Sequence, residues 1–179
     1  MNARRSFALA SSVALVAGMI ALAAIANAGT DATTGDASRA TLKYHSLATA
    51  KAAGYGLLKD KNGVSCIAMD DMPAMGAMGV HYVKKALVGD AVLNAKTPEA
   101  LVYEPSQGKL RLVAVEYVVL KSAWDAHHSG APRLFGQTFN FTPAGNRFGL
   151  PAYYSLHAWL WKYNPSGVFS MWNPTVTCP

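Results

Sequence analysis

Residues 101–120 carry a β-hairpin signature, and this feature limits the possible folds of the chain most strongly. Two apolar segments, 101–104 and 110–120, flank the turn-forming sequence Pro105-Ser106-Gln107-Gly108. Apolar segments on either side of a short turn rich in Pro and Gly are typical of paired antiparallel strands. The sequence therefore predicts an antiparallel hairpin in the middle of the chain, against which the other elements must pack.

The other elements expected from the sequence complete an α+β domain. Ser38 can cap a helix over residues 39–53, which Gly54 would end. Further strands are expected at 64–68, 135–141 and 153–162, and residues 79–88 can form a strand or a short helix. One helix followed by several strands predicts an N-terminal helix packed on an antiparallel, aromatic-rich β-sheet or partly closed barrel.

The first 28 residues have the pattern of a secretory signal peptide. Arg4 and Arg5 precede an apolar segment, and Ala26-Asn27-Ala28 matches the small-x-small cleavage pattern. A retained membrane anchor is the alternative, because the apolar segment is long enough to span a bilayer. We expect cleavage, a flexible leader at 29–38 and a single domain at 39–179. The protein would then be secreted or periplasmic, with no stable membrane span after signal removal.

Charge and motif content argue against several classes of function. Removing Arg4 and Arg5 leaves 14 of the 16 basic residues, against 10 acidic ones, and Lys84-Lys85 is the only adjacent basic pair in the rest. Such a scattered, mild excess does not predict nucleic-acid binding. The chain also lacks a Gly-x-Ser-x-Gly elbow and a phosphate-binding glycine loop. These observations leave open whether the protein is an enzyme.

The chain has two cysteines, Cys66 and Cys178. An even number of cysteines in an exported protein predicts a disulfide bond. Two thiolate metal ligands are the alternative, although the spacing is not that of a Cys-x-x-Cys metal motif. A disulfide would attach the C-terminus to the beginning of the core.

A run of soft metal ligands precedes the hairpin. Met69, Met72, Met75, Met78 and His81 recur at every third position. Thioether sulfur favours Cu(I), so the four methionines form one candidate metal site, that of a copper-binding carrier. The structural alternative is a loop in which methionine fills an irregular apolar gap.

His81, Glu116 and His157 form the principal candidate site. A carboxylate on an apolar strand face needs a partner or a metal ion. Glu116 is expected to share such a face with four apolar residues, Leu112, Ala114, Val118 and Leu120. Two histidines and one carboxylate are the ligand set of sites that hold iron, zinc or copper. The alternatives are an ion pair of Glu116 with Arg111, Arg133 or Arg147, and a hydrogen-bonded core position for His157.

Two weaker candidates complete the set. Asp125 and His128 have metal-capable side chains, but their polar surroundings favour a solvent-exposed loop. Aromatic residues are frequent in the C-terminal third and could line a pocket for a small apolar or planar ligand, or form the core. The expected partner is therefore a metal ion or a small molecule.

Several segments of the chain resemble a family of small secreted proteins that has no established activity. They are Gly76-Ala77-Met78-Gly79-Val80-His81-Tyr82, Leu112-Val113-Ala114-Val115-Glu116-Tyr117, Leu156-His157-Ala158-Trp159-Leu160-Trp161 and Trp172-Asn173-Pro174-Thr175-Val176-Thr177-Cys178, together with residues 98–103. The resemblance implies export and a single domain, and it implies no reaction and no catalytic residue.

Overall fold

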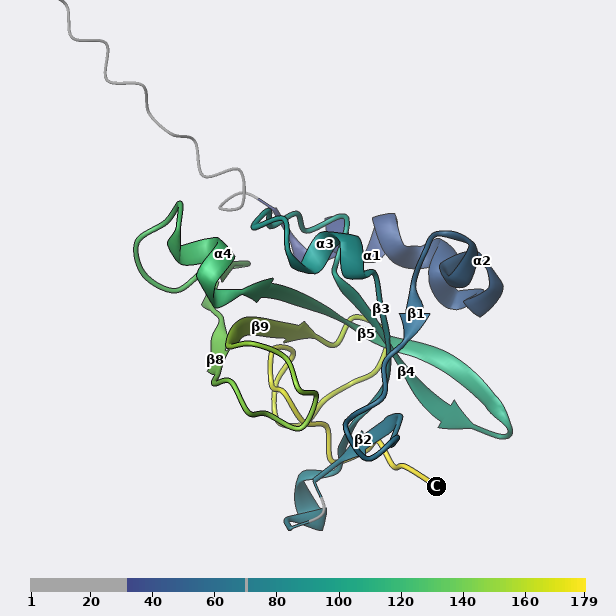
Figure 1. The fold of residues 1–179 in the computed structure, drawn as a ribbon. Coiled ribbons are helices and arrows are strands. Elements are labelled where there is room, and N and C mark those ends of the chain that lie inside the picture. Colours follow the sequence, from purple (N-terminus) through teal and green to yellow (C-terminus); the bar gives the residue numbers. More distant parts are fainter. Residues whose placement is uncertain (1–31, 70) are drawn as a thin grey trace, which may run out of the picture.

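The computed structural model describes residues 32–69 and 71–179, so the predicted signal peptide lies outside the described residues. The described chain is an α+β structure in which one antiparallel sheet carries the core (Figure 1). In spatial order, the sheet contains β1 (Gly56–Leu57), β3 (Ala77–Val83), β4 (Ala100–Ser106), β5 (Lys109–Leu120), β9 (Tyr153–Ala158) and β8 (Asn140–Thr142), with β2 (Cys66–Ala68) also paired to β3. The sheet is open, and no closed barrel is found among the described strands.

The predicted hairpin is confirmed as β4 and β5, with a tighter turn than expected. Ser106 pairs with Lys109, which leaves Gln107 and Gly108 as the only turn residues. Both have positive φ, at 50° and 73°, as a two-residue hairpin turn of the favoured twist requires. The strands thus extend through Pro105, which the sequence pattern had assigned to the turn.

The N-terminal helical segment differs from the single helix expected at 39–53. It consists of α1 (Thr34–Thr41), the 3-10 helix η1 (Leu42–His45) and α2 (Leu47–Ala52). Thr33 and Asp36 form a capping box, so α1 begins within the expected leader rather than after Ser38. Ser46 then caps α2 by accepting a hydrogen bond from the Thr49 amide, which starts a second helix where continuity was expected.

The helical segment packs on one face of the sheet. In Figure 1, α1 and α2 lie on one side of the strands and the yellow C-terminal loops lie on the other. Tyr44 and Ala50 share a buried cluster with Tyr103 of β4. The Tyr103 hydroxyl donates a hydrogen bond to the Tyr44 carbonyl at 2.7 Å, so the buried tyrosine is satisfied and the segment is fixed to the sheet.

Two β-bulges redirect side chains around the centre of the sheet. Ile67 pairs with Gly79 and Ala68 pairs with Ala77, which leaves Met78 as the extra residue. In the same way, Val113 is the extra residue opposite Val102 and Tyr103. A bulge shifts the side-chain alternation of a strand by one residue. Leu112 therefore lies in the cluster under the helices, whereas Ala114 lies in a second cluster. The expectation that Leu112 shares the face of Glu116 was wrong, while Ala114, two residues before Glu116, keeps that face.

The remaining elements are short. The segment 79–88 contains both expected forms, the end of β3 and the helix α3 (Lys85–Val88). The continuous strands expected at 135–141 and 153–162 were wrong in extent. Phe135 has φ of 52°, so the chain turns there between β6 (Arg133–Leu134) and β7 (Gln137–Thr138), and β9 ends at Ala158. The other helices are η2 (Pro73–Met75) and α4 (Lys121–Asp125).

Glu99 stabilises the sheet at the point where β4 begins. Its carboxylate accepts a hydrogen bond from the Val118 amide at 3.0 Å, beyond the last paired residue of β4. The side chain is buried, and burial raises the pKa of Glu99 to about 8. A side chain thereby satisfies a backbone donor for which the strand supplies no partner.

The predicted disulfide is confirmed between Cys66 and Cys178. It joins β2 to the C-terminal segment, which also forms a bridge between Asn173 and Ala77 of β3. A disulfide fits an extracellular or periplasmic protein. No helix among the described residues is long and apolar enough to cross a membrane.

Candidate metal centre

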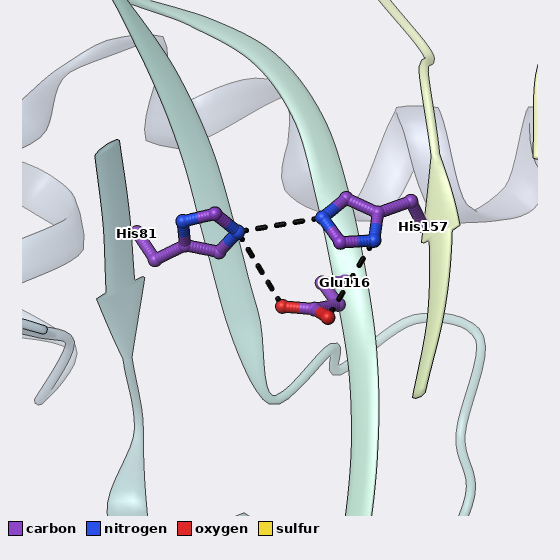
Figure 2. A group of neighbouring side chains, drawn as sticks. All are labelled: His81, Glu116 and His157. Carbon is purple, nitrogen blue, oxygen red and sulfur yellow. Dashed lines mark hydrogen bonds and ion pairs between the residues drawn. The ribbon is translucent and has the colours of Figure 1, made fainter. Parts of the chain in front are cut away.

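The sheet brings together the three residues of the principal candidate site. Figure 2 shows His81, Glu116 and His157 projecting toward one another from β3, β5 and β9. Glu116 and His157 are direct cross-strand neighbours, and such neighbours project from the same face of a sheet. The residues lie on the face opposite Tyr82 and Val115, which belong to the cluster under the helices.

His81 reaches Glu116 across the intervening strand β4. His81 pairs with Val102, and Glu116 pairs with Ala100. Strands lie about 4.8 Å apart, so β3 and β5 are separated by roughly twice that distance. Ala100 is fully buried and has only a methyl group, which leaves room above β4 for the imidazole and the carboxylate to meet. The small residue in β4 is therefore a condition for the cluster.

The polar atoms form a tight group in which each residue contacts both others. His81 Nε2 lies 3.4 Å from His157 Nε2 and 3.5 Å from Glu116 Oε2. His157 Nδ1 lies 3.5 Å from Glu116 Oε1. One ligand atom from each residue can be chosen so that all three lie within 4.8 Å of one another.

Burial determines the charge state of the cluster. The side chains of His81 and His157 are 3% and 1% exposed, and that of Glu116 is 12% exposed. Burial lowers the pKa of His81 to about 4, although the charge of Glu116 opposes this shift, and burial lowers the pKa of His157 to about 3. Burial also raises the pKa of the Glu116 carboxyl. Both imidazoles are therefore neutral near pH 7, the form in which histidine binds a metal ion.

The cluster is incompletely hydrogen-bonded by the protein. The buried Nδ1 atoms of His81 and His157 have no hydrogen-bond partner among the described residues. The contact between His157 Nδ1 and Glu116 Oε1 is close enough for an ion pair but is not aligned as a hydrogen bond. Buried polar atoms in folded proteins nearly always have a partner, so this site has unused capacity to bind a ligand or ion.

Two of the three ligand spacings match the dimensions of a metal site, and both involve His81 Nε2. Zinc binds histidine nitrogen and carboxylate oxygen at about 2.1 Å, so neighbouring ligands of a tetrahedral ion lie roughly 3.4 Å apart. The distances from His81 Nε2 to His157 Nε2 and to Glu116 Oε2 are 3.4 Å and 3.5 Å. Three protein ligands would leave one tetrahedral position open.

A cavity of about 640 Å³ adjoins the site, and both His81 and Glu116 line it. The rest of its wall is predominantly apolar and comes from segments far apart in the sequence, including Val88 of α3, Val118 of β5, Phe148 and Trp172. Sequence reasoning suggested a pocket lined by C-terminal aromatic residues, and Tyr153 and Trp172 do line this cavity, but it missed the other wall residues. These residues carry no common motif, and only the fold brings them together.

Residues 143–150 form one wall of the cavity and are held by their own polar contacts. The Asn146 side chain donates hydrogen bonds to the carbonyls of Pro143 and Leu150 and accepts them from the amides of Phe148 and Leu150. Arg147 pairs with Asp60 at 2.9 Å. These hydrogen bonds and this ion pair fix the conformation of the cavity wall.

The four candidate copper ligands, the Met run Met69, Met72, Met75 and Met78, lie in two different environments. Met69 and Met78 line the cavity, whereas Met72 and Met75 are exposed by 52% and 37%. The bulge at Met78 directs its side chain toward the cavity. A copper site made of all four methionines stays a prediction.

The other candidates have ordinary structural roles. His128 stacks on Trp124, and Asp125 pairs with Lys121, all on or beside the surface helix α4. The arginine partners considered for Glu116 are engaged elsewhere or exposed: Arg147 with Asp60, Arg133 with Thr138, and Arg111 on the surface. Of the aromatic residues in the C-terminal third, Phe139, Tyr153, Tyr154 and Trp159 are buried in the core, and Tyr153, Phe148 and Trp172 line the cavity.

Searches of protein-family models, curated proteins and solved structures found no match to this chain. The resemblance to a family of small secreted proteins therefore stays a prediction.

Proposed function

We propose that this protein is an exported domain that binds one transition-metal ion through His81, Glu116 and His157. The observation that carries the proposal is the convergence of two neutral imidazoles and one carboxylate from three strands, with ligand atoms within 4.8 Å of one another. Two histidines and one carboxylate with an open position are the ligand set of zinc and non-haem iron(II) sites.

The surroundings of the cluster support this proposal over a purely structural role. No lysine or arginine among the described residues forms an ion pair with Glu116. The Ser155 side chain favours the ionised form of Glu116 against its burial, but the Nδ1 atoms of the two neighbouring imidazoles have no partner among the described residues. A divalent cation would supply the missing opposite charge and favour the ionised form of Glu116.

Copper binding by the Met run is a second candidate, favoured by one observation. Met69 and Met78 line the same cavity as His81 and Glu116. A Cu(I) ion held by these two thioethers would use ligands that suit it, because soft sulfur selects Cu(I). The exposure of Met72 and Met75 does not support a site that needs all four methionines.

Metal titration of the purified protein tests the proposal. We expect one Zn(II) to bind per chain, measured by calorimetry, and His157→Gln to weaken binding by at least about a hundredfold, since even outer-shell changes at metal sites cost 10–100-fold. Met72→Ala is the matched control and should leave Zn(II) affinity unchanged. Wild-type binding no tighter than about millimolar, or an unchanged affinity in His157→Gln, would contradict the proposal.

The same variants distinguish the copper alternative. If Met69 and Met78 hold Cu(I), then Met78→Leu should weaken Cu(I) binding while His157→Gln should not. Leu keeps the apolar volume at position 78 but removes the thioether, so any loss reports on ligation rather than packing.

A further inference from the structure

The cavity beside His81 and Glu116 has the size and wall chemistry of a site for a small apolar molecule. Its volume of about 640 Å³ lies within the range of about 300–1,000 Å³ that is usual for small-molecule sites. The sheet contributes Val118 and Leu120, and residues 143–151 contribute Phe148 and Leu150. A ligand in this space would bury mostly hydrocarbon.

The charged groups of the wall lie in two separate places. His81 and Glu116 project from the sheet, where His81 is buried. Arg147 belongs to the segment 143–151, and Lys85 is the first residue of α3. The Arg147 charge is paired with Asp60, while Lys85 is exposed and makes no ion pair with a described residue. An incoming polar group can thus meet either the metal cluster or Lys85.

Charge balance at the metal cluster selects the kind of head group. A divalent ion bound by one carboxylate and two neutral imidazoles retains one net positive charge. An uncompensated charge beside an apolar cavity is costly, whereas a monoanionic oxygen ligand at the open position would neutralise it. The wall beyond that position is hydrocarbon, so the remainder of the ligand should be apolar.

We propose that the cavity binds an apolar monocarboxylate, such as a medium-chain alkanoic acid, whose carboxylate coordinates the metal ion at His81, Glu116 and His157. This inference rests on the proposed metal binding. It assigns the open position to the ligand's carboxylate and the apolar wall to its hydrocarbon chain.

Calorimetry on the Zn(II)-loaded and metal-free protein tests the proposal with hexanoate, octanoate and decanoate. We expect the loaded protein to bind octanoate about fifteenfold more tightly than hexanoate, since each buried methylene contributes about fourfold. Decanoate should bind the metal-free protein at least about tenfold more weakly, because the charge-assisted contact is lost. Decan-1-ol, which lacks the anionic group, should show no such dependence on Zn(II).

Two tryptophan substitutions locate the hydrocarbon chain. Val88 lines the cavity, whereas Val92 is 60% exposed and does not line it. Val88→Trp should weaken decanoate binding at least about tenfold while Zn(II) affinity stays as in the wild type, and Val92→Trp should change neither. The chain-length series on wild type tests the same point without any substitution.

The outcomes separate the two proposals. If Zn(II) binds and His157→Gln abolishes that binding, but decanoate binds no better than hexanoate, the carboxylate proposal is overturned and metal binding stands. If decanoate binds equally with and without Zn(II), and Lys85→Gln weakens it, the head group lies at Lys85 and the proposal is also overturned. If Zn(II) does not bind at all, both proposals fall.

Discussion

The Nε2 atoms of His81 and His157 lie 3.4 Å apart, although the residues are 76 positions apart in the sequence. In the absence of a cation, this contact is a hydrogen bond in which one imidazole donates and the other accepts. The donor ring then has Nδ1 without a proton, and the acceptor ring has Nδ1–H. Neither Nδ1 atom has a hydrogen-bond partner among the described residues, so the metal-free arrangement leaves buried polar atoms unsatisfied.

Ala100→Leu is expected to block the metal centre. Ala100 pairs with Glu116 on β5 and is fully buried, so a leucine side chain would occupy the space where His81 meets the carboxylate. We expect Zn(II) affinity to fall by more than about tenfold, with a loss of stability of about 1–3 kcal/mol from overpacking. Ala100→Ser, of similar volume, is the control, and calorimetry is the measurement. Equal Zn(II) affinity in Ala100→Leu would show that the cluster does not need this space.

Glu116→Gln should affect stability only when metal is present. No arginine or lysine among the described residues pairs with Glu116, and burial raises the pKa of this carboxyl. Replacing it by an amide of similar shape should change the free energy of unfolding of the metal-free protein by no more than about 1 kcal/mol. Zn(II) at a hundred times its dissociation constant should stabilise the wild type by about 2.7 kcal/mol and leave the variant unaffected. Denaturant titration with and without Zn(II) measures both quantities, and a large loss in the metal-free variant would reveal a positive partner for Glu116.

Acidification should destabilise the metal-free protein through its two buried imidazoles. Burial lowers the pKa of His81 to about 4 and of His157 to about 3, from 6.5. Between pH 6.5 and these lowered pKa values, the unfolded chain binds more protons than the folded one. The contribution of the two histidines to the free energy of unfolding is therefore fully present above pH 6.5 and is lost as the pH falls toward 3. Each pKa unit corresponds to about 1.4 kcal/mol, so the loss should reach several kcal/mol.

The contribution of His157 can be isolated by subtraction. Glu99, whose pKa is raised to about 8, and Glu116, whose pKa burial also raises, act in the opposite direction, because the folded state binds more protons at these carboxyls than the unfolded one. Both carboxyls are present in wild type and in His157→Gln, and His157 is not among the causes of the Glu116 shift, so their effects cancel in the difference. We expect the stability of wild type to decrease more steeply than that of His157→Gln from pH 6.5 to 4 in urea titrations. Parallel curves would mean that His157 is not buried in the neutral form.

Gly76→Ala should be far more destabilising than Gly63→Ala. Both glycines have positive φ, at 72° and 81°. A Cβ atom at position 76 would lie 2.1 Å from the Asn173 carbonyl oxygen, whereas one at position 63 meets nothing within 4 Å. Gly63→Ala should cost about 1–2 kcal/mol for the left-handed backbone alone. Gly76→Ala should cost several kcal/mol more in thermal or denaturant unfolding, because it displaces the C-terminal segment from β3. Similar losses in both variants would show that this segment moves freely.

Local sequence signals predicted the hairpin and the candidate ligands because both depend on short-range chemistry. Two apolar segments around Gln107-Gly108 specify a turn, and an acidic residue among apolar neighbours marked Glu116 as needing a partner. The same kind of signal failed for the helix at 39–53, where the caps at Thr33 and Ser46 set the boundaries. A capping side chain fixes where a helix begins through hydrogen bonds within a few residues. The apolar pattern over 39–53 therefore did not show where the two helices begin.

The remaining parts of the site depend on long-range packing. The bulge at Val113 separates Leu112 from Ala114, and no turn residue in that strand signals it. The cavity wall combines α3, the sheet, residues 143–151 and the C-terminal segment, whose proximity follows from strand order. The sequence suggested that His81, Glu116 and His157 could meet. It could not show that Ala100 leaves space for them to do so.

The Cys66–Cys178 bond closes a covalent ring that contains His81, Glu116 and His157. A single backbone cut anywhere between the two cysteines would therefore open the ring without releasing a fragment, and both pieces would stay tethered with all their ligands. Because Cys178 packs against the buried cluster that contains Ala77 of β3, the pieces would remain attached beside β3, where re-pairing is intramolecular. Reduction of the disulfide removes this protection, so a nicked protein should come apart only under reducing conditions.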